Sequence, residues 1–323
     1  MLAAVPPQPV PVAAHSWYLG DLDPGRLRAV GAADATAAAG LPRAVVVLDA
    51  GDPDTAPGST QLPAGLGLGS ARQLQAAFMA YAAGFRAAPG APPLVLVLAT
   101  STFGGHVDAA HGTGWAAVVS AVAAASPGAD VRGGVDAEPA YGPASAALSF
   151  VRAYVAAGGP AIVDLGDCPC APGQALPQGW SLTDRADLAT AGSVLPEQYR
   201  SSGIDAMRWG YLDARVRVVR HRPLDVLGVL TQTRACASTA ARVEECRAAR
   251  TAQQPAVALA GLSAALGRPV TAATDVGYLV PPAPHPRRGH GLALGLGVGL
   301  PAALLLAAAG LVLRRRRRVR AAS

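Results

Sequence analysis

The chain has 323 residues, of which 51% are hydrophobic, so it is long enough for one large folded domain with an appended segment. Its formal net charge is +6, but eight arginines lie at positions 287, 288, 314–318 and 320. Without those eight, residues 1–286 carry a net charge of −2. This balance argues against a nucleic-acid-binding domain.

The N-terminal third predicts alternating strands and helices. Residues 1–14 are Pro-rich and predict an extended or disordered segment. They lack the basic start and apolar run of a signal peptide, so we expect that peptide to lie upstream of Met1. Residues 44–49 form an apolar run that ends in Asp49 and predicts a buried parallel strand. The other elements expected here are a strand at 15–20, a weak helix at 24–39, a loop at 51–69, a helix at 70–87 capped by Ser70, a strand at 94–99, a loop at 100–111 and a helix at 112–125.

A strand at residues 131–138 ends in two carboxylates, Asp136 and Glu138, and is followed directly by Pro139. Side chains two positions apart on a strand face the same side, roughly 6 to 7 Å from each other. At the C-terminal end of a strand in an α/β domain, such a pair lies where loops build active sites. The spacing is near the low end of that used by paired acids in glycoside hydrolysis. A solvated strand end or a salt-bridged structural acid is the alternative.

The remaining elements continue the alternation. They are a helix at 144–157, a strand at 161–164, a helix starting at Thr183, a strand at 194–199, a helix at 202–211, strands at 216–220 and 226–231, helices at 237–250 and 255–266, and a strand at 271–279. About eight strands interleaved with helices predict an α/β fold, a (β/α)8 TIM-type barrel, with an open doubly wound sheet as the second choice. Neither a Gly-x-Gly-x-x-Gly motif after the first strand nor a Walker sequence is present, which argues against a nucleotide-binding domain.

Four cysteines suit an oxidising compartment and allow three pairings. Our first choice pairs Cys236 with Cys246, which leaves Cys168 and Cys170 to bond each other or to cross-pair. A zinc site is a weaker alternative, because one residue separates Cys168 from Cys170 and no histidine is near them.

The C-terminal region predicts a membrane anchor. Residues 292–313 contain 22 uncharged residues, enough to span a bilayer as a helix. The Arg-rich tail that follows places the C-terminus in the cytoplasm by the positive-inside rule. We therefore expect a single-pass cell-membrane protein, with an extracytoplasmic domain at 15–280, a Pro/Arg linker at 281–291, the helix at 292–313 and a basic cytoplasmic tail at 314–323.

Several short motifs occur in an order that resembles one known family. They are the Leu-Asp strand end before Gly51, the Ala99 to Ser101 strand end, Asp-x-Glu-Pro at 136–139, Gly-Asp-Cys-Pro at 166–169, Gly-Trp at 179–180 and Pro-Glu-x-Tyr at 196–199. Residues 15–280 thus resemble a family of secreted actinobacterial glycoside-hydrolase-like proteins, which is distantly similar to the family 25 lysozymes. The resemblance implies a barrel with a saccharide-facing mouth.

The carboxylates and aromatic residues near strand ends are the candidate site residues. Glu138 is our choice for the general acid. Asp136 is expected to balance charge on the sugar or, as the lysozyme resemblance implies, to orient an N-acetyl group. The expected substrate-binding residues are Asp49, Asp164, Asp167, Trp180, Glu197 and Tyr199, with Tyr141 and Trp209 as further aromatic candidates. Capping, ion pairing and core packing are the alternatives for these residues. We expect no cofactor and no metal, because the spacing of His106, Asp108 and His111 fits no metal site that we can complete.

The leading hypothesis is a membrane-anchored glycoside-hydrolase-like protein that acts on or binds cell-envelope polysaccharide or peptidoglycan. A non-catalytic binding module on the same scaffold is the main alternative. It is favoured by Val135 and Tyr141, where the resembling family has Asn and Trp. A purely structural envelope protein is a third possibility.

Overall fold

The computed structural model describes residues 12–63, 67–104, 106–200, 202–237 and 254–280. Within them, eight parallel strands form one sheet in the order β10-β11-β1-β2-β6-β7-β8-β9. The strands are β1 (Ala14–Leu19), β2 (Ala44–Asp49), β6 (Leu94–Ser101), β7 (Asp130–Asp136), β8 (Ile162–Asp164), β9 (Ser193–Val194), β10 (Val229–Thr231) and β11 (Ala273–Leu279).

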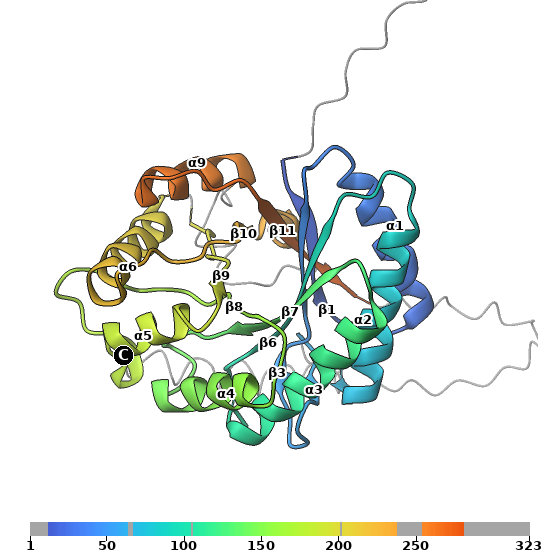
Figure 1. The fold of residues 1–323 in the computed structure, drawn as a ribbon, viewed down its shortest axis with the longest axis horizontal. Coiled ribbons are helices and arrows are strands. Elements are labelled where there is room, and N and C mark those ends of the chain that lie inside the picture. The colour runs from blue at the N-terminus through green and yellow to red at the C-terminus, as the bar shows by residue number, and fades with distance from the viewer. Residues whose placement is uncertain (1–11, 64–66, 105, 201, 238–253, 281–323) are drawn as a thin grey trace, which may run out of the picture. The chain divides into compact units, whose positions relative to one another are not determined.

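The two edge strands of this sheet are also joined, which closes it into a barrel (Figure 1). Parallel bridges pair Val194 with Val226 and Glu197 with Leu230. Backbone hydrogen bonds accompany them: the Gln198 amide donates to the Leu230 carbonyl at 2.8 Å. The predicted α/β fold with an eight-stranded parallel sheet is therefore confirmed, and the bridges between its edges favour the TIM-type barrel over the open doubly wound sheet.

Helices occupy each described connection between successive barrel strands and lie outside the barrel (Figure 1). They are α1 (Pro24–Ala37), α2 (Ala71–Ala87), α3 (Ala109–Ala125), α4 (Ala144–Ala156), α5 (Leu182–Ala189), α6 (Ile204–Arg220), α7 (Thr233–Ala237) and α9 (Pro255–Leu266), with a short 3-10 turn at Pro177–Gly179. Local sequence sets several starts: Ser70 and Gln73 form a capping box for α2, and Ser181 and Asp184 form one for α5.

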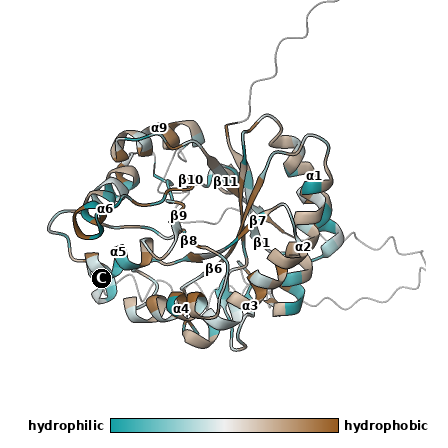
Figure 2. Ribbon diagram, viewed as in Figure 1, coloured by the Kyte–Doolittle hydropathy of each residue, from teal (hydrophilic) through white to brown (hydrophobic). Residues whose placement is uncertain are grey.

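Alternation along the strands separates an inner layer from an outer layer. Val45 and Val47 of β2 belong to the barrel interior, together with Val97 and Ala99 of β6. The intervening apolar side chains, such as Leu48, pack outward against the helices. Figure 2 shows the hydrophilic residues mainly on the helices. Both faces of the sheet are therefore buried, as expected for parallel strands.

Several predicted segments differ from the structure; the strand predicted at 131–138 ends at Asp136, so Glu138 lies beyond it. The predicted loop at 51–69 contains a small antiparallel sheet of β3 (Asp52–Pro53), β4 (Thr60–Gln61) and β5 (Leu68–Gly69). The predicted strand at 216–220 is wrong, because these residues are the last turn of α6, where Arg217 pairs with Asp213 one turn earlier. The strand predicted at 194–199 keeps regular pairing only at Ser193–Val194.

No helix among the described residues is long and apolar enough to cross a membrane. The predicted spanning segment at 292–313 lies outside the described residues, as do the linker at 281–291, the tail at 314–323 and most of the predicted helix at 237–250. Those predictions stay untested.

Candidate functional site

The C-terminal ends of β2 and β7 bring two predicted acids to the same end of the barrel. Asp49 pairs in register with Ala99, and Asp136 pairs with Ser101 two positions further along β6. Ala99 faces the interior, so strand alternation also turns Asp49 and Asp136 toward the barrel axis. Both side chains remain partly exposed, and this end of the barrel is therefore accessible to solvent.

Three carboxylates meet there. One oxygen each of Asp136, Glu138 and Glu197 lies within 4.8 Å of the other two. Glu138 follows β7 by two residues, and Glu197 lies on the segment after β9 that helps to close the barrel. Glu197 is only 8% exposed. We call these three residues the acid cluster.

Burial and mutual repulsion raise the pKa of acid-cluster members. The pKa of Asp136 is well above its usual value because of burial first, then Glu138 and Asp49. The pKa of Glu197 is raised by burial, Asp136 and Glu138, while a hydrogen bond from Tyr199 acts to lower it. Burial also raises the pKa of nearby Asp49 to about 7, although the Gly51 amide donates to its Oδ1 at 2.7 Å. These acids thus hold their protons to higher pH than exposed carboxylic acids do.

Asp136 differs from its neighbours in its hydrogen bonding. Its Oδ1 is buried and has no hydrogen-bond partner among the described residues. In contrast, the Tyr199 hydroxyl donates to Glu197 Oε1 at 2.9 Å, and the Tyr141 side chain is hydrogen-bonded to Glu138. A buried acceptor without a donor is energetically costly, so Asp136 is suited to be protonated or to receive a donor from a ligand.

Two aromatic residues near the acid cluster were missed by the sequence analysis. The Tyr18 hydroxyl, on β1, lies 3.2 Å from the Tyr199 hydroxyl. Phe103 is 38% exposed and makes an edge-to-face contact with Tyr141, with ring centroids 5.3 Å apart. Tyr18 could have been included because it occupies the end of a predicted strand; Phe103 lies in a predicted loop whose path the sequence does not indicate.

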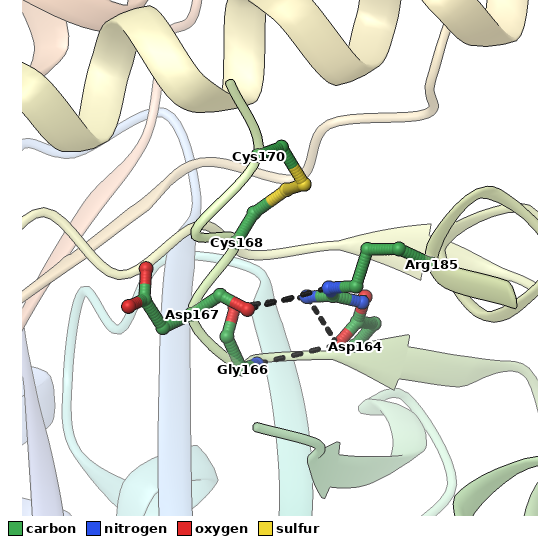
Figure 3. Close-up of a disulfide and its surroundings, with 6 residues drawn as sticks. All are labelled: Asp164, Gly166, Asp167, Cys168, Cys170 and Arg185. Atoms are coloured by element: carbon green, nitrogen blue, oxygen red, sulfur yellow. Dashed lines mark hydrogen bonds and ion pairs between the residues drawn. A yellow bond between two sulfur atoms is a disulfide. The ribbon is translucent and has the colours of Figure 1, made fainter. Parts of the chain in front are cut away.

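Asp164 lies near the acid cluster, but its carboxylate faces the helix layer. It pairs in register with Val135, whose side chain is in the outer core, whereas its neighbour Val163 faces the interior. Figure 3 shows the resulting contact: Arg185 of α5 forms a two-pronged ion pair with Asp164 and also donates to the Gly166 carbonyl at 3.0 Å. The geometry favours the ion-pairing alternative for Asp164 over the predicted binding role.

The loop after β8 contains a disulfide between Cys168 and Cys170, whose Cα atoms are 5.0 Å apart (Figure 3). Both cysteines are buried. Their sulfurs are bonded to each other, so they do not offer the thiolates of the zinc alternative. Cys246 lies outside the described residues, and its predicted bond to Cys236 stays a prediction. Asp167, in the same loop, forms a partly exposed ion pair with Arg200 at 3.6 Å.

Two of the predicted stacking residues are core residues. Trp180 is 5% exposed, and its Nε1 donates to the Gly142 carbonyl at 2.7 Å, which holds the loop that carries Tyr141. Trp209 is fully buried on α6, with the Arg185 guanidinium 5.0 Å from its ring centroid. Tyr141 and Tyr199 are therefore the aromatic candidates that contact the acid cluster.

The histidines have structural contacts. His111 is buried, its Nδ1 lies 2.9 Å from Asp108, and its Nε2 lies 2.5 Å from the Asp54 carbonyl. The acid cluster has a spacing that a divalent cation could bridge, but acidic groups also gather without one. We assign no metal and no cofactor.

Two shallow hollows lie on the outer helices, one between α1 and α2 and the other between α5 and α6. Neither contains a predicted site residue. The acid cluster, rather than these hollows, brings predicted site residues together.

Comparisons with known proteins leave the family open. No protein-family model matches the chain, and no curated protein matches it. A crystal structure of dihydrodipicolinate synthase from Rhodopseudomonas palustris is similar with a TM-score of 0.41 and 13% identity. The match covers 69% of this chain and 65% of that chain, which is just under two thirds of it. A likeness at this level indicates neither a family nor an activity.

Proposed function

We propose that the barrel cleaves a glycosidic bond in cell-envelope polysaccharide or peptidoglycan, with Glu138 and Asp136 as its catalytic pair. One observation supports this proposal. The three carboxylates of the acid cluster lie at the strand ends of a parallel barrel, with one oxygen of each within 4.8 Å of the other two. Carboxylates in such surroundings divide into one that keeps its proton and one that stays ionised, which is what glycoside hydrolysis requires.

Glu138 would protonate the oxygen of the leaving sugar as the bond from that oxygen to the anomeric carbon breaks. A water molecule then adds to the anomeric carbon and returns a proton to Glu138, so the reaction consumes one water and leaves the enzyme unchanged. In its ionised form, Asp136 would balance the positive charge on the sugar. Its buried Oδ1, which has no partner among the described residues, could also accept a hydrogen bond from an N-acetyl group. The close approach of the carboxyl groups favours retention of configuration over inversion.

The proposed location outside the cytoplasm comes from the sequence. The uncharged segment at 292–313 and the arginines after it would anchor the barrel on the outer side of the cell membrane. A disulfide between Cys168 and Cys170 suits an oxidising compartment. The substrate class that fits this location is a glycan of the cell envelope.

The test compares the wild-type full chain with Glu138→Gln for release of soluble sugar from purified cell walls. We expect Glu138→Gln to reduce the rate at least 100-fold while binding to the walls is retained, because a general acid contributes about 10²- to 10⁴-fold. Asp130→Asn is the matched control. Asp130 is at the opposite end of the same strand, its side chain is 48% exposed, and its substitution also removes one negative charge.

The outcomes separate three functions. If the wild type releases sugar and Glu138→Gln and Asp130→Asn reduce the rate equally, the result would contradict the role of Glu138. Binding by all three proteins without any product would indicate the non-catalytic surface module instead. Neither binding nor product would contradict any function based on glycans and favour a structural envelope protein.

A further inference from the structure

Tyr18 and Tyr199 join non-adjacent parts of the barrel through their hydroxyl groups, which are 3.2 Å apart. Tyr18 lies on β1, and Tyr199 lies five residues after β9. In the barrel, β10 and β11 separate β9 from β1. Both rings pack against the interior core, so this contact lies inside the barrel, and Tyr199 connects it to the acid cluster through Glu197.

Each end of this contact is fixed by further interactions. The Tyr18 ring packs on Tyr278 of β11, with centroids 5.1 Å apart. The Tyr199 backbone amide donates to Asp205 Oδ2 at 3.1 Å, and Asp205 is a buried residue in the first turn of α6. The Tyr199 hydroxyl is therefore held in one place. From there it donates to Glu197 Oε1 at 2.9 Å.

We propose that Glu197 is a third functional carboxylate of the site and that Tyr199, braced by Tyr18, is the residue that positions it. The inference rests on the proposed function, which so far uses only Glu138 and Asp136. A hydrogen bond to an ionised carboxylate favours the ionised form. Tyr199 thus opposes the rise in the pKa of Glu197 and favours the ionised form, which would supply the negative charge beside the sugar cation, while Glu138 would transfer its proton to the leaving oxygen.

The groups that face Glu197 make this support necessary. Asp136 and Glu138 approach it from the end of β7 and Asp167 from the loop after β8, and all three raise the pKa of Glu197. Burial acts in the same direction. Among the contributions resolved for Glu197, the Tyr199 hydrogen bond acts in the opposite direction. Without the Tyr199 hydroxyl, Glu197 would hold its proton to higher pH.

The chain has only four glutamates, at 138, 197, 244 and 245, so its glutamate carboxyl carbons can be followed individually by NMR after isotopic labelling. Glu197→Gln assigns the Glu197 signal. We expect the pKa measured from that signal to be higher in Tyr199→Phe than in the wild type. In Tyr18→Phe, which leaves the direct donor in place, we expect a smaller rise in this pKa. Tyr154→Phe is the control. Tyr154 is a buried tyrosine of α4, and its ring packs against Gly133 in the middle of β7 and not against the acid cluster.

Kinetics on cell-wall glycan complete the test. We expect Tyr199→Phe to lower kcat about tenfold with little change in KM and to shift the acidic limb of the pH profile to higher pH. Tyr154→Phe should keep the wild-type profile. An unchanged Glu197 titration in Tyr199→Phe would overturn the positioning role, whatever the activity. A shifted titration in a protein that releases no sugar would retain the positioning contact but reject the proposed hydrolysis and, with it, the catalytic role of Glu197.

Discussion

At the residue scale, the direction of one side chain separates an acid in the site from an acid in the framework. Asp136 and Asp164 end neighbouring strands, and both follow apolar runs in the sequence. The register pairs Asp164 with Val135, one position before Asp136, so the two carboxylates lie on opposite faces of the sheet. Asp164 is then buried in the helix layer, where Arg185 neutralises it.

This buried ion pair leads to a stability prediction. Arg185→Leu should lower the free energy of unfolding by about 3 to 5 kcal/mol, because it leaves Asp164 buried without its partner. The control is Arg220→Leu, which removes a surface ion pair with Asp187 and should cost less than about 1 kcal/mol. Urea denaturation of both variants measures the difference. Equal losses would show that Arg185 contributes no more than a surface charge.

At the element scale, the sequence predicts those segments whose own residues determine their structure. The ranges 44–49 and 255–266 were predicted with the observed bounds, because each has a clear apolar pattern with a recognisable start or end. In contrast, residues 216–220 have strand-like composition, but α6 already includes them, and Val216 packs into the core from the helix. The bridges from Val194 to Val226 and from Glu197 to Leu230 join residues more than 30 positions apart, which no local pattern indicates.

Helix contacts in the outer layer depend on particular glycines. A Cβ atom at Gly84 of α2 would lie 1.9 Å from the Arg28 carbonyl oxygen of α1, so Gly84→Ala must push the two helices apart. We expect it to destabilise the fold by about 2 to 3 kcal/mol. At Gly261 of α9 the nearest atom would be 3.8 Å away, and Gly261→Ala should stabilise the fold by about 0.5 to 1 kcal/mol through helix propensity. Thermal unfolding of both variants checks the opposite signs; destabilisation of similar size in both would contradict this account of α1 and α2.

At the scale of the whole molecule, barrel closure creates the candidate site. Tyr18, Asp49, Asp136 and Glu197 come from four separate parts of the chain and meet because their strands end at the same side of the barrel. The alternation of strands and helices was sufficient to predict this common end and the pair Asp136 and Glu138. It was not sufficient to predict the Tyr18 contact or the outward direction of Asp164, because both depend on the register between strands.

The accumulation of acids at one end should make the stability of the whole fold depend on pH. Burial raises the pKa of Asp49 to about 7, whereas in the unfolded chain it is close to the ordinary value of about 3.9. Between these pH values the folded chain holds a proton that the unfolded chain releases, so the contribution of Asp49 to stability falls as pH rises from about 4 to above 7.

Asp49→Asn tests this dependence, because asparagine cannot ionise and still offers an oxygen to the Gly51 amide. We expect the variant to be more stable than the wild type at pH 8 by about 1 to 2 kcal/mol, since partial exposure screens the charge, and the difference to disappear near pH 4. Asp130→Asn, which removes an exposed carboxylate, should show no such gap. Melting temperatures of both variants and the wild type, measured from pH 4 to 8, test this dependence. If the stability difference between Asp49→Asn and the wild type stays constant with pH, Asp49 ionises normally. In that case its carboxylate does not destabilise the fold at neutral pH.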